Sequence, residues 1–272
     1  MAIPCPPCYT TVASAHTLYT DYREGFGMVG INVTIFNEYV HEKIHEEVKS
    51  VYPDGIHSVL AGFLGQDAEI GQVRTATLED HREALSQEVL DDTDVLVWWG
   101  HMKHHEVDDE VVARCAQRVL RGMGLVVLHS GHASKLFRRL MGTETELLRW
   151  REVGEKCRVW RVKGNHPIAQ GVPESFVVPH EEMYGEPFGI PEPDELVFLS
   201  WYAGGDVFRS GCTWQRGEGK IFYFQNGHET YPVYYQPEIQ RVITNAVKWA
   251  KAPNRVFNAD RGGPNTAALE VL

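Results

Sequence analysis

Short apolar runs alternate with stretches of helical periodicity from residue 31 onward. The run at residues 94–99 (DVLVWW) is apolar almost throughout, which is typical of a strand buried on both faces of a sheet. In the first half of the chain such runs predict strands at residues 31–36, 72–77, 94–99 and 125–128. The spacing between them predicts helices at residues 41–52, 56–64, 107–121 and 135–141.

The second half of the chain is richer in strands. Candidate strands lie at residues 157–162, 175–179, 195–201, 212–214 and 220–225. A last helix carries apolar residues at i, i+3, i+4 and i+7 between Ile239 and Ala250. Strands that alternate with helices predict an α/β fold with a mostly parallel sheet covered on both faces. In such a sheet the loops that follow the strands lie at one edge, where ligands bind.

Length and charge exclude several classes of protein. The 272 residues include 26 Lys and Arg against 37 Asp and Glu, so the net charge of −11 leaves no surplus of cations for nucleic-acid phosphates. No apolar run approaches the roughly 18 residues that a membrane span needs. The length predicts a single α/β domain at residues 30–252, with an atypical, poorly ordered leader at 1–29 and an extension at 253–272. The N-terminus lacks a secretory pattern, which favours a cytoplasmic location.

The five cysteines do not form an evident framework. An odd number in a chain of this length favours reduced thiols over disulfides. Cys5 and Cys8 have CxxC spacing, but they lie in a proline-rich terminus, and no second pair completes a tetrahedral zinc site. Cys115 is expected on the apolar face of a helix, and Cys157 and Cys212 are expected in strands.

Polar side chains, histidine above all, stand at the ends of five predicted strands. Each alone is explained as a surface or capping residue, but together they predict a functional crevice at the carboxyl ends of the strands. The residues are Asn37, Glu38 and His41 after residues 31–36; Trp99 and His101 at the end of residues 94–99; His129, Ser130 and His132 after residues 125–128; His180, Glu181, Glu182 and Tyr184 after residues 175–179; and His228 and Glu229 after residues 220–225.

The segment LHSGH at residues 128–132 passes from a strand through a tight turn into a helix. This is the geometry of a nucleophile elbow, with Ser130 at the apex and His228 as the candidate base. The segment does not match the GxSxG motif, so hydrogen bonding to a ligand or to the turn is favoured for Ser130. A hydrolase that uses Ser130 as its nucleophile stays open as an alternative.

Histidines and carboxylates without an evident nucleophile suit acid–base catalysis or metal-ion catalysis. The candidate catalytic residues are His129, Glu182 and His228. His101, His129 and His228 could supply three imidazoles to a divalent metal such as zinc, with a carboxylate or water completing the shell. No HExxH or HxH spacing supports this metal, so metal-free use of the same residues stays open.

Local spacing ranks some neighbouring candidates. Glu181 and Glu182 would point to opposite sides of a strand, and Glu182 is preferred for the crevice because Tyr184 would share its side. His41 and His45 lie four residues apart on a predicted helix, which could form a metal pair. The glutamates around them favour a solvated helix face instead.

Several of these runs together resemble the trehalose-utilisation (ThuA-like) family. They are DVLVWWGH, GLVVLHSGH, HEEMYGEPF, GEGKIFYFQNGHETYP and NAVKWA, and the resemblance spans residues 31–250. The family belongs to the class I glutamine amidotransferase-like superfamily, so the resemblance implies a flavodoxin-like three-layer sandwich. It further implies that His129 is the family's strand-end histidine, that Glu181, Glu182 and Tyr184 form its acidic-acidic-x-Tyr motif, and that His228 belongs to its Gly-His motif.

Comparison with amidotransferases argues against glutaminase activity. Those enzymes place a cysteine at the elbow, where this chain has Ser130. The resemblance implies carbohydrate catabolism instead, on trehalose or a related disaccharide, including keto sugars. No GxGxxG follows a strand, so neither a nicotinamide nor a flavin fingerprint is present, and a separate sugar dehydrogenase is the expected partner for any hydride step.

Aromatic residues in and beside the predicted loops suit a small-molecule sugar. The candidate substrate-binding residues are Asn37, Glu38, His41, Trp99, His101, Ser130, His180, Glu181, Tyr184 and Glu229. A non-catalytic sugar- or metal-binding partner of a sugar oxidoreductase is a second interpretation, and association into a homo-oligomer is left open. His81 is expected on a surface segment and therefore serves as a control position.

Overall fold

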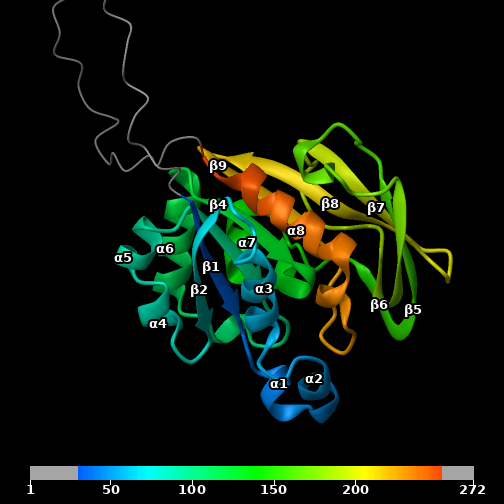
Figure 1. Cartoon of the computed structure of the whole chain (residues 1–272), viewed down its shortest axis with the longest axis horizontal. Coiled ribbons are helices and arrows are strands. Elements are labelled where there is room, and N and C mark those ends of the chain that lie inside the picture. The colour runs from blue at the N-terminus through cyan, green and yellow to red at the C-terminus, as the bar shows by residue number, and fades with distance from the viewer. Residues whose placement is uncertain (1–29, 253–272) are drawn as a thin grey trace, which may run out of the picture.

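The computed structural model describes residues 30–252, so the predicted leader and C-terminal extension lie outside the described residues. Within this range nine strands form one sheet (Figure 1). Five of them pair in parallel and alternate with helices, as their apolar runs predict. In spatial order they are β2 (Ile70–Thr77), β1 (Ile31–Asn37), β3 (Val95–Trp99), β4 (Gly124–Leu128) and β9 (Gly219–Phe224).

Four antiparallel strands continue the sheet beyond β9. In spatial order they are β8 (Val207–Arg216), β7 (Glu195–Tyr202), β5 (Arg149–Arg161) and β6 (Ser175–Gly185). The predicted α/β class is therefore confirmed, but the sheet is mixed rather than mostly parallel. The strands of this half follow one another without long helices, so antiparallel pairing is what their connections permit.

The helices fall into two groups. The α-helices are α1 (His41–Ile44), α2 (Glu46–Val51), α3 (Ile56–Leu64), α4 (His81–Ala84), α5 (Gln87–Asp91), α6 (Asp109–Leu120), α7 (Lys135–Met141) and α8 (Pro237–Ala250). α3 contacts α8, whereas α6 contacts both α5 and α7. From β1 the chain crosses to one neighbour through α3, and from β3 it crosses in the opposite direction through α6. Right-handed crossovers therefore place α3 and α6 on opposite faces of the parallel strands.

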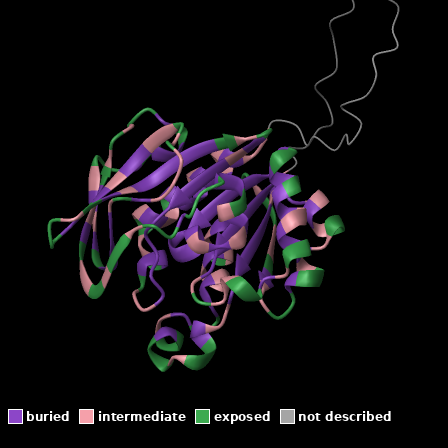
Figure 2. Cartoon of the chain, turned by 180° about the vertical axis from the view of Figure 1, so that it is seen from behind, coloured by how far each residue is buried: buried purple, intermediate pink, exposed green. Residues whose placement is uncertain are grey.

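The core lies around the central parallel strands. β3 and β4 are buried at every residue, and β1 and β9 are buried at nearly every residue (Figure 2). Such strands make apolar contacts on both faces, which explains their continuous apolar sequence. Because β1, β3, β4 and β9 are parallel, their carboxyl ends share one edge of the sheet. At this edge α1 and α2 form a small lobe at the bottom of Figure 1. Among the described residues, no helix is both long enough and apolar enough to cross a membrane.

Among the predicted elements whose bounds differ from the structure are a helix and a strand that carry candidate site residues. The helix predicted at residues 41–52 is broken at His45, whose backbone is extended (φ −118°, ψ 114°), so α1 and α2 are separate short helices. The strand predicted at residues 175–179 continues through the acidic residues to Gly185. A charged pair normally ends an apolar strand, but here Glu181 and Glu182 are buried against polar partners, which lets the ladder continue.

Candidate functional site

Three histidines meet at the carboxyl ends of three adjacent strands. His101 follows β3, His129 follows β4 and His228 follows β9. The expected pairing of the strands before His129 and His228 is confirmed. The three ring centroids lie 5.3, 5.8 and 6.1 Å apart. One ligand atom from each histidine and one carboxylate oxygen of Glu229 all lie within 4.8 Å of one another, so the fold assembles a compact donor set from distant segments.

His129 occupies the strained position of the turn after β4. Its φ is +49°, in the left-handed region that side chains rarely adopt and that is often found at functional sites. His129 also begins a short 3₁₀ helix that ends at Ala133. The apex of the turn is therefore His129, and the expectation that Ser130 stands there is wrong. Ser130 lies one residue further, and its buried Oγ has no hydrogen-bond partner of good geometry among the described residues.

The hydrogen bonds of His129 aim its second nitrogen at a carboxylate. Nδ1 lies 2.9 Å from the carbonyl oxygen of Gln225, which can only accept, so Nδ1 carries the proton. Nε2 then faces Oε2 of Glu182 at 3.2 Å, but neither of these two atoms has a hydrogen bond of good geometry. Burial lowers the pKa of His129, but the carboxylates of Glu182, Glu181 and Glu229 raise it more, to about 9. This position therefore favours a cation, either a proton or a metal ion.

Glu229 carries the carboxylate of the donor set. Its Oε1 lies 2.9 Å from Nδ1 of His41 and 3.7 Å from Nε2 of His101. Burial raises the pKa of Glu229, but the surrounding imidazoles outweigh burial and hold it well below its usual range. The expectation that His41 and His45 share a solvated face is wrong for His41, which is buried. The break between α1 and α2 lets His41 reach Glu229 and leaves His45 partly exposed.

His101 and His228 are held in the neutral form. Burial is the main cause that lowers the pKa of each to about 4. Nδ1 of His228 accepts a hydrogen bond from the backbone N–H of Thr230 at 3.3 Å and lies 2.7 Å from the hydroxyl of the same residue, whereas Nε2 faces Glu182 and Glu229. Neutral imidazole is the form that binds metals, so both side chains are prepared for that role at neutral pH.

Glu181 and Glu182 point in different directions. Glu182 lines the cavity described below, whereas Glu181 accepts hydrogen bonds from the backbone N–H groups of Gly227 and His228 at 3.0 and 3.1 Å. The side-chain amide of Asn226 donates a third hydrogen bond to Glu181 at 3.2 Å. Glu181 therefore fixes the loop that presents His228.

Glu38 holds the loop after β3 by hydrogen bonds, as Glu181 holds the loop after β9. Its Oε2 accepts hydrogen bonds from the backbone N–H groups of Met102 and Lys103 at 2.9 and 3.0 Å. Its Oε1 lies 3.2 Å from Nδ1 of His104. This buried carboxylate therefore fixes the loop that presents His101, rather than facing the cavity.

A cavity of about 390 Å³ opens beside the histidines. Its volume lies in the usual range for small-molecule sites. Its wall includes the rings of Trp150, Tyr184 and His132 together with the carboxylates of Glu152 and Glu182. A second cavity of about 410 Å³ adjoins it, because both are lined by His101, Ala133 and Glu146. Aromatic and acidic groups together suit a polyhydroxylated ligand.

The sequence assigned no role to the wall residues His132, Trp150 and Glu152. His132 stands in the predicted turn, but nothing in the spacing distinguishes it from a capping residue. Trp150 and Glu152 lie on the first part of β5, which begins eight residues before the predicted strand at residue 157. That part of β5 is largely exposed and has no apolar run, so only the period-two spacing of Trp150 and Glu152 could have indicated it.

Three predicted binding residues have other partners in the structure. Asn37 donates a hydrogen bond to Oε1 of Glu42 at 2.7 Å, and the indole of Trp99 donates to the carbonyl of Gly227 at 3.2 Å. His180 is exposed, and its Nδ1 lies 3.0 Å from a backbone carbonyl of β5. None of the three lines the cavity beside the histidines.

The expectation that His81 lies on the surface is wrong. His81 is buried, its Nδ1 lies 2.6 Å from the carbonyl of Leu78, and its Nε2 accepts a hydrogen bond from the backbone N–H of Asp108. Asp108 is the N-cap of α6, so His81 supports the start of that helix. Glu46, whose side chain is 85% exposed on α2 and lines neither cavity beside the histidines, is the suitable control position.

The cysteines of the described residues are free and buried. They lie in α6, β5 and β8, as predicted for Cys115, Cys157 and Cys212. Burial raises the pKa of each thiol to about 12, so none is a ready nucleophile.

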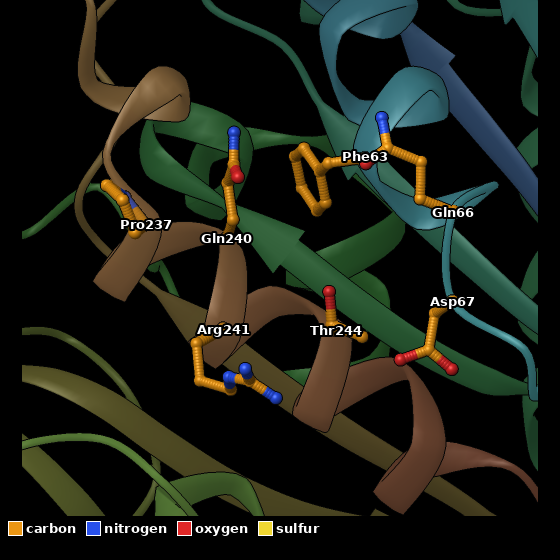
Figure 3. A pocket seen from close by; sticks show the side chains of 7 residues that line it. All are labelled: Phe63, Gln66, Asp67, Pro237, Gln240, Arg241 and Thr244. Atoms are coloured by element: carbon orange, nitrogen blue, oxygen red, sulfur yellow. The ribbon is translucent and has the colours of Figure 1, made fainter.

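Another hollow lies between α3 and α8, away from the histidines. Figure 3 shows its lining, which includes Phe63, Asp67, Gln240 and Arg241. It shares no lining residue with the two cavities beside the histidines. It is open and polar and lacks a convergent set of titratable groups, so the strand-end site is the better candidate.

The fold is shared with solved structures of low sequence identity. A ThuA-like protein from Parabacteroides merdae superposes with a TM-score of 0.62 at 16% identity, covering 84% of this chain and 93% of that one. A cytoplasmic protein from Salmonella typhimurium LT2 gives a TM-score of 0.57 at 12% identity, covering 81% and 99%. At these identities the similarity shows a shared α/β fold, one that ThuA-like proteins adopt.

The sequence itself places the chain within that class. Residues 32–250 match the family model described as trehalose utilisation (ThuA), and the chain belongs to this family. No curated protein matches the sequence significantly. Membership supports a carbohydrate-related role.

Proposed function

We propose that this protein binds a divalent metal such as zinc through His101, His129, His228 and Glu229, and processes a sugar in the adjoining cavity. The observation that carries the proposal is the convergence of four donor atoms within 4.8 Å. A tetrahedral ion with bonds of 2.0–2.1 Å draws its donors to about 3.4 Å from one another. Small side-chain movements would therefore close the set around an ion.

Unpaired polar atoms support a cation at this position. Nε2 of His129 and Oε2 of Glu229 are buried and have no hydrogen-bond partner of good geometry among the described residues. The buried carboxylates of Glu181 and Glu182 add negative charge around them. Burying such groups without compensation costs several kcal/mol, and a divalent ion would supply that compensation.

The surrounding residues support a division of roles. A bound divalent metal would supply Lewis-acid polarisation of a substrate oxygen. Glu182 faces both His129 and the cavity, and the imidazoles around it outweigh burial and lower its pKa, so this carboxylate can accept a proton from the substrate. Trp150, which is exposed on β5 and lines the cavity, can pack its ring against the apolar side of a sugar ring.

The substrate follows from the family and the size of the cavity. We propose trehalose or a related (keto-)disaccharide, because the family is described by trehalose utilisation and the two adjoining cavities have room for such a molecule. We also propose that the parallel strands and their two helix groups form a flavodoxin-like three-layer unit. This arrangement would account for a ligand site at the carboxyl ends of the strands.

Turnover of trehalose and 3-keto-trehalose by the purified protein tests the proposal. His129→Ala and His228→Ala should each reduce turnover by about 10²–10⁴, the usual contribution of a positioned acid, base or ligand. Glu46→Ala should leave turnover unchanged because its side chain is 85% exposed on α2 and lines neither cavity. Equal activity of all three variants would contradict the assigned site. Sugar binding without turnover would support the non-catalytic binding partner instead.

A metal-free acid–base pair is the second candidate. Nε2 of His129 lies 3.2 Å from Glu182, and the pKa of His129 is raised to about 9, which would let the imidazolium donate a proton. Activity that survives complete chelation would favour this pair. A Ser130 hydrolase lacks comparable support, because no described histidine makes a hydrogen bond to Oγ of Ser130.

The associations of the protein are proposed on the same basis. We propose a separate sugar dehydrogenase for any hydride step, and a homo-oligomer is left to solution measurement. A structural relative from Salmonella typhimurium is named as cytoplasmic, and we propose the same compartment for this chain.

A further inference from the structure

His132 lines the cavity but belongs neither to the donor set nor to the acid–base pair. We infer that Nε2 of His132 is a fixed hydrogen-bond acceptor that recognises one hydroxyl group of the sugar and rejects a carbonyl at that position. The inference rests on the proposed function and adds a specificity determinant to it. A sugar substrate would then need a free hydroxyl where it meets His132.

The hydrogen bonds of His132 settle which ring nitrogen is free. Nδ1 lies 3.0 Å from the carbonyl oxygen of Thr145, and a carbonyl can only accept, so Nδ1 carries the proton. The hydroxyl of Thr145 donates in return to the carbonyl of His132, which ties the two segments together. Nε2 is consequently left with its lone pair for a ligand in the cavity.

Neighbouring rings prevent the imidazole from turning. Tyr184, Phe188 and Tyr223 contact it edge-to-face, with centroids at 5.4, 5.7 and 6.1 Å and interplanar angles of 86–89°. Burial keeps the ring neutral by lowering the pKa of His132 to about 3. A ring that neither rotates nor gains a second proton presents the same acceptor at every physiological pH.

A fixed acceptor separates hydroxyl from carbonyl groups. A sugar hydroxyl can donate to Nε2, whereas a keto oxygen at the same place would set two acceptors against each other. A site built to pair with a hydroxyl loses much affinity when that hydroxyl is missing, because its own polar group is left buried and unpaired. In a keto-sugar the carbonyl would therefore lie elsewhere, toward the donor set.

Two variants of His132 isolate this acceptor. In His132→Asn the side-chain amide can still donate to the carbonyl of Thr145, but no atom remains at the position of Nε2. In His132→Gln the longer amide can return an acceptor to that position. Thermal melting of both variants checks that the fold is intact before binding is measured.

The experiment is calorimetric titration of wild type and both variants with trehalose and its monodeoxy analogues. His132→Asn should bind trehalose about tenfold more weakly, the value of one hydrogen bond. One deoxy analogue should bind wild type and His132→Asn equally, because the recognised hydroxyl is absent, and His132→Gln should recover part of the affinity for trehalose.

Two results would overturn the inference. If His132→Asn lost affinity equally for trehalose and every deoxy analogue, or lost affinity for none of them, His132 would recognise no particular hydroxyl. The proposed sugar function would stay in place. Failure of wild type to bind any of these sugars would remove the proposed sugar function and the inference together.

Discussion

The protonation state of each buried histidine near the cavity follows from the balance between burial and the neighbouring carboxylates. The pKa of His129 is raised because carboxylates outweigh burial, whereas burial dominates for His101, His228 and His132. One imidazole is thereby prepared to be charged, and three are prepared to act as neutral ligands or acceptors. Residue type alone would have given all four histidines a pKa near 6.5.

The stability of the protein should depend on pH through His132. Its pKa is about 3 in the folded protein and about 6.5 in the unfolded chain, so between these values only the unfolded chain binds the proton. The free energy of unfolding is therefore not reduced by His132 above pH 6.5, and below that pH it falls by up to about 1.4 kcal/mol per pH unit. His132→Asn should show a shallower fall in the free energy of unfolding between pH 6.5 and 4. Parallel wild-type and variant curves from urea denaturation would contradict the assignment.

At the scale of elements, the loop after β9 depends on a glycine. Gly227 has a φ of +140°, and a Cβ there would lie 2.0 Å from the hydroxyl of Tyr234. Its N–H donates to Glu181, and its carbonyl accepts from Trp99. The loop that presents His228 therefore needs the backbone conformation of Gly227 and its hydrogen bonds to Glu181 and Trp99.

Gly227→Ala should destabilise the protein by about 2–4 kcal/mol, because both the backbone conformation and the space oppose a methyl group. Gly62→Ala is the matched control. Gly62 lies exposed within α3 and has open space around it, so alanine should add about 0.5–1 kcal/mol. Chemical denaturation measures both changes, and a Gly227→Ala protein as stable as wild type would show that the loop tolerates other conformations.

The sequence predicted the elements whose signals are local. β3, β4, α7 and α8 follow from apolar runs and helical spacing, and His101, His129 and His228 follow from their positions after strands. His41, Glu152 and Trp150 could not be placed with equal success. The position of His41 depends on the helix break at His45. The positions of Trp150 and Glu152 depend on the exposed first part of β5 and its antiparallel pairing with β6, which no local sequence pattern indicates strongly.

At the scale of the whole molecule, the site needs both halves of the sheet. The parallel strands supply the three histidines and Glu229 at their carboxyl ends, and antiparallel β5 and β6 supply Trp150, Glu152 and Glu182 from within strands. The ligand cavity lies where these two contributions face each other. The extension of the sheet beyond β9 therefore supplies one wall of the cavity beside the strand-end cluster.

The metal content of protein purified without chelator tests the central claim most directly. Elemental analysis should find about one transition-metal ion per chain in wild type and in Glu46→Ala, because four donor atoms converge and the exposed Glu46 is not among them. The double variant His129→Ala/His228→Ala should lose that metal. A wild-type protein that contains no metal and rebinds none at neutral pH, or a double variant that retains its full content, would contradict the assignment of these residues as ligands.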